Sequence, residues 1–210
     1  MVLDTQREKV DPALTFFARF FSQLHPNILT WISLVFAFIA GLLFYLSNPV
    51  TESTRCYLLS AALFVFLNGF FDAVDGKVAK LTNQTSLKGD FLDHALDRYA
   101  DVFMVGGIAL SPWCRSEIGL LAMVGMLLTS YMGTQAQAVG YRREYRGLLG
   151  RADRLVLLMI FPVLQHFFIP FQLPLDISIM ELVLLYFAVV GNITAIQRFL
   201  STMKWFKNQQ

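Results

Sequence analysis

The sequence predicts an all-α membrane protein with six transmembrane helices and an amphipathic N-terminal helix at the membrane interface. Composition is the first reason: hydrophobic residues make up 56% of the 210 residues and charged residues only 15%, which is little for a soluble domain. The second reason is that apolar runs of about 20 residues, the length that crosses a bilayer, recur along the chain. Little of the chain is left for a soluble domain.

The N-terminal segment is polar up to residue 10 and amphipathic after it. Pro12 suits a first helical turn. The helix that follows carries an apolar stripe made of Leu14, Phe17, Phe20, Phe21 and Leu24. This segment is too short and too polar to cross a bilayer, so it is expected to lie on the membrane surface. Residues 1–27 are therefore predicted to form a cytosolic N-terminal region.

Six apolar segments follow, separated by polar or turn-forming residues. The predicted spans are residues 28–46, 57–74, 90–110, 118–139, 155–171 and 177–199. The break at His25-Pro26-Asn27 precedes the first span, and Ser47-Asn48-Pro49 ends it. Residues 28–203 are expected to form one transmembrane domain, followed by a cytosolic tail of residues 204–210.

The placement of lysine and arginine predicts the orientation of these spans. The N-terminal segment, the links at residues 80–88 and 140–154 and the C-terminal end hold nearly all of them. The opposite side holds only Arg55 and Arg115. By the positive-inside rule, both termini of a multi-pass protein of the cell membrane would face the cytosol.

Two pairs of aspartates stand where the second span ends and the third begins. Asp72 and Asp75 are spaced i,i+3, and Asp93 and Asp97 are spaced i,i+4. Each spacing puts both side chains on one helix face, and the predicted topology puts both pairs just inside the cytosolic face. Four carboxylates together are costly unless they hold cations, and hard divalent ions prefer oxygen ligands. The sequence therefore predicts a site for two ions, Mg²⁺ or Mn²⁺, that handles phosphates.

A structural role for these carboxylates is the alternative. A single aspartate here could cap a helix or pair with Lys80, Lys88 or Arg98. Four at these spacings, with Gly76 and Gly89 between the pairs, favour a functional site, because glycine lets a ligand approach the backbone. Lys80 would offer a point charge to a phosphate. Two neighbours on the third span have other expected roles: His94 points off the aspartate face and is interpreted as structural, and Asp101 is a candidate partner for an arginine.

Residues 72–97 resemble the signature of the CDP-alcohol phosphotransferase family, D-x2-D-G-x2-A-R-x8-G-x3-D-x3-D. The matching positions are Asp72, Asp75, Gly76, Ala79, Gly89, Asp93 and Asp97. Lys80 departs from the pattern, because the family usually has arginine there. The charge is kept but the bidentate fork of a guanidinium is lost.

The resemblance implies a phospholipid-synthesising transferase that moves the lipid-phosphate group of a CDP-linked lipid to an alcohol and releases CMP. It implies that Asp72, Asp75 and Asp93 bind the metal, and that Asp97 is the general base and also touches a metal. The residues implied for the nucleotide and diphosphate are Asp72, Gly76, Ala79, Lys80 and Gly89. It further implies a homodimer whose active site opens to the cytosol, and it makes residues 28–203 the catalytic domain.

Arginines on the same side predict a phosphorylated acceptor. The link between the fourth and fifth spans contains five arginines and no lysine, and Arg198 lies inside an apolar run near the cytosolic end of the sixth span. Contact with anionic lipid headgroups also explains such residues, but guanidinium forks suit phosphate recognition. The candidate acceptor-phosphate ligands are Arg142, Arg151, Arg154 and Arg198.

The stretches 91–101 and 150–154 are similar to the inositol-phosphate-using branch of the family, including its archaetidylinositol-phosphate-forming members. The expected acceptor is L-myo-inositol 1-phosphate, with glycerol 3-phosphate or serine as alternatives, and the donor is CDP-archaeol or CDP-diacylglycerol. Membrane lipids are expected partners and nucleic acid is not. An intramembrane prenyltransferase and a divalent-cation carrier are the rival classes. A carrier would place its site near the bilayer midplane, often within a repeated architecture, and the sequence shows no repeat.

Overall fold

The computed structural model describes residues 7–49, 52–142, 147–168 and 177–207. The regular elements in these ranges are all α-helices, which confirms the all-α prediction. They are α1 (Arg7–Phe20), α2 (Pro26–Leu46), α3 (Glu52–Leu81), α4 (Leu87–Ala109), α5 (Ser116–Ala138), α6 (Arg151–Phe167) and α7 (Ile179–Lys207).

Four of these helices are long and apolar enough to cross a membrane by length and composition: α2, α3 from Cys56 onward, α5 and α7. They indicate a multi-pass membrane protein. The other two predicted spans correspond to α4, which carries the charged side chains of the acidic motif, and α6, which has only 17 residues. The predicted number of six spans thus remains a prediction for these two helices.

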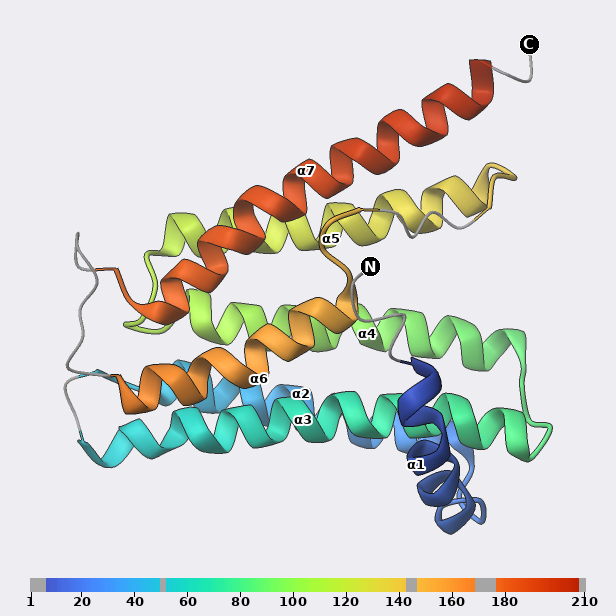
Figure 1. The fold of residues 1–210 in the computed structure, drawn as a ribbon, viewed down its shortest axis with the longest axis horizontal. Helices are drawn as coiled ribbons and strands as arrows, with labels where there is room; N and C mark the ends of the chain where they lie inside the picture. Colours follow the sequence, from blue (N-terminus) through green and yellow to red (C-terminus); the bar gives the residue numbers. More distant parts are fainter. Residues whose placement is uncertain (1–6, 50–51, 143–146, 169–176, 208–210) are drawn as a thin grey trace.

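The helices after α1 form a closed ring of contacts. α2 packs against α3 and α4, α5 packs against α4 and α7, and α6 joins α3 to α7. Figure 1 shows α2 and α3 side by side, with α5 and α7 on the far side of α4. The C-terminal part of α3, the N-terminal half of α4 and the start of α6 lie close together toward one end of the bundle, where side chains of all three helices form ion pairs.

The first helix runs across the α2–α3 pair rather than along it (Figure 1). Ala18 is fully buried against the pair, and the ring of Phe17 lies 5.1 Å from that of Phe70 on α3. Phe16 and Phe20 are 70% and 76% exposed. One face of α1 thus packs on the α3 turns that precede and contain Asp72 and Asp75, and its aromatic face stays open.

Several helix boundaries differ from the predicted spans. α3 continues to Leu81, beyond the apolar run predicted to end at residue 74, because Lys77, Ala79, Lys80 and Leu81 are good helix formers that outweigh Asp75 and Gly76. α6 begins at Arg151 rather than 155, where the backbone N–H of Gly150 donates to Asp153 Oδ2 at 3.0 Å. At the C-terminus, residues 204–207 of the predicted tail form the end of α7.

Polar contacts join the helix ends farthest from the acidic motif. Trp113 Nε1 donates to Ser47 Oγ at 2.8 Å, which ties the α4–α5 connection to the end of α2. The buried carboxylate of Glu181 on α7 lies 2.6 Å from Arg115 Nε. These contacts fix the far end of the ring without involving any predicted site residue.

The crossing of α2 and α4 requires glycine on both helices. A Cβ on Gly41 would lie 2.2 Å from the backbone oxygen of Phe103, and one on Gly107 would lie 2.1 Å from the backbone oxygen of Gly41. No side chain fits at either distance, so the two backbones touch. This contact sets the separation of α2 from α4, the helix that carries Asp93 and Asp97.

Replacing Gly41 with alanine is expected to cost about 1–3 kcal/mol of stability, because the helices must move apart to admit the methyl group. Thermal unfolding in a single detergent would measure the loss. Gly69→Ala on α3 is the matched control, since its Cβ would meet only Leu155 Cδ1, at 3.4 Å, and alanine favours a helix over glycine by about 1 kcal/mol. Equal melting temperatures for Gly41→Ala and the unmodified protein would contradict the close crossing.

Candidate active site

The structure brings together the two aspartate pairs that the sequence places 18 or more residues apart. Asp72 and Asp75 lie near the end of α3, and Asp93 and Asp97 lie in the first half of α4. Ser86 caps α4 by accepting a hydrogen bond from the backbone N–H of Gly89 at 3.0 Å, which fixes where the helix begins. One carboxylate oxygen from each of Asp72, Asp75 and Asp93 can be chosen so that all lie within 4.8 Å of one another.

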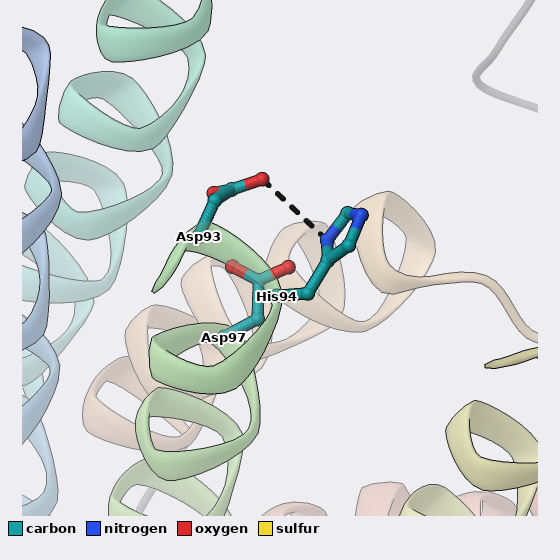
Figure 2. A group of neighbouring side chains, drawn as sticks. All are labelled: Asp93, His94 and Asp97. Atoms are coloured by element: carbon teal, nitrogen blue, oxygen red, sulfur yellow. Dashed lines mark ion pairs between the residues drawn. The ribbon is translucent and has the colours of Figure 1, made fainter. Parts of the chain in front are cut away.

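A second group of possible ligands shares Asp93 with the first. Asp93, His94 and Asp97 also offer atoms within 4.8 Å of one another. Figure 2 shows the imidazole of His94 turned toward Asp93, and its Nδ1 lies 3.5 Å from Asp93 Oδ2. The other ring nitrogen lies 3.3 Å from Asp90 Oδ1. His94 thus lies beside the carboxylates rather than off their face, and it pairs with two of the aspartates of α4.

Asp75 is the most deeply buried member of the first ligand group. Its residue is 4% exposed, and its Oδ2 atom has no hydrogen-bond partner among the described residues. Thr30 of α2 is a side-chain hydrogen-bond partner of this carboxylate. A buried carboxylate oxygen without a partner is costly, and a metal ion would satisfy it. The carboxylate-only donor set of Asp72, Asp75 and Asp93 therefore fits a hard divalent cation.

Arg151, the first residue of α6, bridges the two helices of the motif. Its Nη1 donates to Asp72 Oδ2 at 2.6 Å, and its Nη2 lies 2.7 Å from Asp97 Oδ1. The other oxygen of Asp97, Oδ2, lies 3.3 Å from Arg98 Nη2. In this structure both oxygens of Asp97 thus face a guanidinium group.

A further ion pair lies one helical turn farther along α4 and α6. Arg154 Nη2 donates to Asp101 Oδ2 at 2.8 Å, and both side chains are 3% exposed, so the prediction that Asp101 pairs with an arginine is confirmed. Arg98 also donates to Ser130 of α5. The Nε atoms of Arg98, Arg151 and Arg154 are all buried without a hydrogen-bond partner among the described residues. Three unsatisfied N–H donors from two helices favour an anion at this place.

Charges in the cluster do not balance. Five carboxylates face three guanidinium groups, which leaves an excess of two negative charges when all are ionised. The carboxylates are those of Asp72, Asp75, Asp93, Asp97 and Asp101, and the guanidinium groups are those of Arg98, Arg151 and Arg154. A dication would restore neutrality, and its charge would lower the cost of burying this many ionised groups.

The positions predicted to contact the nucleotide surround the carboxylates. Gly76 is exposed, and a Cβ there would meet no atom within 4 Å, so the helix is open beside Asp75. A Cβ on Gly89 would lie 3.2 Å from Ser86 Oγ and 3.6 Å from Asn27 Oδ1. Lys80 is exposed in the last turn of α3, one residue after the half-buried Ala79.

The four predicted acceptor arginines do not lie together. Arg151 and Arg154 belong to the cluster. Arg198 of α7 is buried and donates to the backbone oxygen of Thr129 at 2.7 Å. Arg142 is exposed beyond the end of α5, with its guanidinium carbon 5.6 Å from the ring centre of Tyr141.

Thr30, Ser130 and Arg98 contact the site but were not among the residues predicted for it. The first two hydroxyls come from other helices, and no pattern in the chain links them to the motif. Arg98 directly follows Asp97, and this adjacency was the one available signal, but only the helix packing shows that it contacts Asp97 and Ser130 together.

Comparisons with known proteins agree with the motif. A family model described as CDP-alcohol phosphatidyltransferase matches residues 23–194. Archaetidylinositol phosphate synthase of Pyrococcus horikoshii is 30% identical over 135 residues, which cover 64% of this chain and 67% of that protein. Phosphatidylinositol phosphate synthase of Streptomyces avermitilis is 30% identical over 197 residues, covering 88% and 75%.

Solved structures share the fold. The crystal structure of Mycobacterium tuberculosis phosphatidylinositol phosphate synthase with CDP-DAG bound has a TM-score of 0.72 at 22% identity, covering 90% of this chain and 92% of that one. The complex of the same protein with manganese and citrate has a TM-score of 0.73 at 22% identity, covering 90% and 88%. At this identity the similarity establishes the arrangement of the helices and nothing further.

Proposed function

This chain belongs to the CDP-alcohol phosphatidyltransferase family, and we propose on that basis that it transfers the lipid-phosphate group of a CDP-linked lipid to L-myo-inositol 1-phosphate, with release of CMP. Relatives named archaetidylinositol phosphate synthase and phosphatidylinositol phosphate synthase support this choice of acceptor. Glycerol 3-phosphate and serine are the alternative acceptors. CDP-archaeol and CDP-diacylglycerol are the candidate donors.

The observation behind the proposal is that buried acceptor atoms and buried donor atoms without hydrogen-bond partners occur in the same cluster. Asp75 Oδ2 is buried without a hydrogen-bond partner among the described residues, next to two more carboxylates. The Nε atoms of Arg98, Arg151 and Arg154 lack partners in the same way. A metal-bound diphosphate on the first side and an acceptor phosphate on the second would satisfy both sets of atoms.

Asp72, Asp75, Asp93 and Asp97 would hold the divalent cation, and two ligand groups that share Asp93 support two ions, Mg²⁺ or Mn²⁺. When bound, such ions offset the charge of the diphosphate and of the departing CMP. The residues proposed for the nucleotide are Asp72, Gly76, Ala79, Lys80 and Gly89. The open space beside Gly76 supports a close approach of the substrate to α3.

Asp97 is proposed as the general base. As the acceptor hydroxyl oxygen forms its bond to the lipid-bearing phosphorus, the bond from that phosphorus to the CMP oxygen breaks. The hydroxyl proton passes to the carboxylate of Asp97, and CMP leaves with the bridging oxygen. A well-placed base contributes about 10²–10⁴-fold in rate. Burial of Asp97 beside the other carboxylates supports this role.

Arg151 and Arg154 are the proposed ligands of the acceptor phosphate. Arg98 is added to them because its Nε is also buried without a hydrogen-bond partner among the described residues. Arg198 remains a candidate through its buried position on α7. Arg142 is proposed to act from the loop before α6. Serine as acceptor would leave the three unsatisfied guanidinium donors of the cluster without a phosphate.

In the membrane, α4 and α6 are proposed as the third and fifth of six spans, with α1 at the interface and both termini in the cytosol of a homodimer in the cell membrane. Residues 28–203 would be the catalytic domain. The ring of contacts supports this, because α4 and α6 each pack between two helices that are apolar enough to span.

The two native cysteines test this orientation. Cys56 near the start of α3 and Cys114 between α4 and α5 would both face the outside. A membrane-impermeant maleimide added to intact cells is expected to label the exposed Cys56 readily. Cys114 should react far more slowly, because burial and the neighbouring Glu181 raise the pKa of its thiol to about 12 and leave little thiolate near neutral pH. Labelling of Cys56 only after the membrane is opened would invert the topology.

The proposed function is tested by CMP release from purified protein given a CDP-linked lipid and Mg²⁺. Inositol 1-phosphate, glycerol 3-phosphate, serine and free inositol are supplied in separate reactions. The proposal predicts release with inositol 1-phosphate and none after chelation of the metal. No CMP with any acceptor, together with pyrophosphate released from a prenyl diphosphate supplied in a further reaction, would favour a prenyltransferase. CMP release with serine would overturn the proposed role of the arginines.

A further inference from the structure

Arg151 is shared by two candidate metal ligands. One guanidinium group reaches Asp72 Oδ2 at 2.6 Å and Asp97 Oδ1 at 2.7 Å, so a single side chain from α6 joins α3 to α4. The fork of a guanidinium allows this, because it presents several donors in a fixed plane. Arg151 thus occupies two carboxylates that would otherwise be available to a divalent cation.

Asp97 has no oxygen free for a cation while it is held in this way. Its Oδ1 faces Arg151 and its Oδ2 lies 3.3 Å from Arg98 Nη2. A carboxylate whose two oxygens both face guanidinium groups is a poor metal ligand, because each oxygen is already paired with a positive charge. One of the two arginines must leave before Asp97 can bind a cation through an unpaired oxygen.

The two arginines differ in what else holds them. Arg98 stands next to Asp97 on α4, donates to Ser130 of α5 and lies 3.8 Å from Asp101. Arg151 has its ion pairs to the two motif carboxylates, and its Nε is buried without a hydrogen-bond partner among the described residues. Arg151 is therefore the arginine that can leave with the smaller loss of other contacts, and its Nε gains a partner if it moves to an anion.

We propose that Arg151 exchanges between two anionic partners: the carboxylates of Asp72 and Asp97 when the cluster holds no cation, and a phosphate group when a divalent cation takes those carboxylates. The identity of that phosphate as the acceptor's rests on the proposed function. The exchange makes cation and phosphate bind cooperatively.

Mn²⁺ affinity, measured by electron paramagnetic resonance on the full chain in detergent, tests the exchange without any substrate. Arg151→Gln is expected to bind Mn²⁺ about tenfold more tightly, because no ion pair has to break first. Loss of a positive charge alone would also tighten Mn²⁺ binding, so Arg151→Lys is the decisive variant. It keeps the charge, but its ammonium group lacks the planar fork that spans both carboxylates, so tighter binding is expected here too.

Arg115→Gln is the matched control, since it removes an arginine that also forms a 2.6 Å ion pair with a carboxylate, at the far end of the ring. Its Mn²⁺ affinity should match that of the unmodified protein. Arg151→Lys binding Mn²⁺ no more tightly than the unmodified protein would overturn the exchange, provided that its thermal unfolding shows a folded protein.

Sulfate serves as the phosphate probe for the second half of the proposal. It should tighten Mn²⁺ binding several-fold in the unmodified protein and have no such effect in Arg151→Gln, because coupling between two ligands is reciprocal. The same sulfate effect in both proteins would overturn the role of Arg151. None of these measurements uses CMP release, so an absence of transfer with every acceptor would remove the proposed function and leave the Mn²⁺ competition standing.

Discussion

Replacing Asp75 with asparagine is expected to weaken Mn²⁺ binding by more than about 100-fold, beyond the loss usually caused by removing a residue that only orients a metal ligand. Asp75 is 4% exposed, and its Oδ2 has no hydrogen-bond partner among the described residues, so its charge is poorly compensated unless a cation binds. CMP release should fall by about a thousandfold, because charge stabilisation at the diphosphate is lost.

The variant should nevertheless fold, because asparagine has the size of aspartate and removes an uncompensated buried charge. Higher melting temperature together with lost Mn²⁺ binding is therefore the expected signature. Asp11→Asn is the matched control: Asp11 pairs with Lys77, two residues beyond Asp75, but its own side chain is 56% exposed on α1. Normal Mn²⁺ affinity in Asp75→Asn would contradict a metal site at this carboxylate.

Asp97→Asn is expected to lower kcat for CMP release by about a thousandfold, within the range for loss of a general base. Mn²⁺ binding should survive, since Asp72, Asp75 and Asp93 still offer three carboxylates. The amide keeps the shape of the side chain but accepts no proton at neutral pH. Retained metal binding with lost turnover separates this variant from Asp75→Asn.

Asp90→Asn is the control for this second prediction. Asp90 lies on the same helix as Asp97, but its side chain is 68% exposed and its described ion pair is to His94. Its removal should change kcat little. Turnover in Asp97→Asn within a few-fold of that of Asp90→Asn would exclude Asp97 as the base and direct attention to Asp93 or His94.

Much of the fold could be predicted because the bilayer imposes a simple rule on sequence. Apolar runs of sufficient length had to be helices, and the described elements are all helices. The boundaries were less predictable, since an apolar run ends where the membrane ends and not where the helix ends. α3 shows this, as it continues through Asp72 and Asp75 to Leu81.

The acidic cluster could be predicted for a different reason. Helical periodicity predicted the face of each aspartate pair, and the predicted orientation of the spans put both pairs at one depth. Contacts between helices that are distant in sequence could not be predicted in this way. The bridge from Arg151 to Asp72 and Asp97 and the pairing of Arg154 with Asp101 depend on how α6 packs, which no local pattern encodes.

The sequence predicts a common phosphate-binding role for Arg142, Arg151, Arg154 and Arg198, but in the structure these arginines do not lie together. The charge of an arginine does not show whether its side chain is paired with a carboxylate or is available to bind a ligand. Arg154 is 3% exposed and held by Asp101, whereas Arg142 is exposed beside Tyr141. Burial and the remaining unsatisfied donors make that distinction, and both come only from the packed structure.

The central claim is that the acceptor already carries a phosphate and keeps it. Mass spectrometry of the lipid formed from a CDP-linked lipid, Mg²⁺ and inositol 1-phosphate labelled with ¹⁸O in its phosphate tests this directly. We expect a lipid with two phosphorus atoms, one in a diester to the lipid and one in a labelled monoester on the inositol ring. A lipid with a single phosphorus atom, or one formed equally well from free inositol, would contradict it.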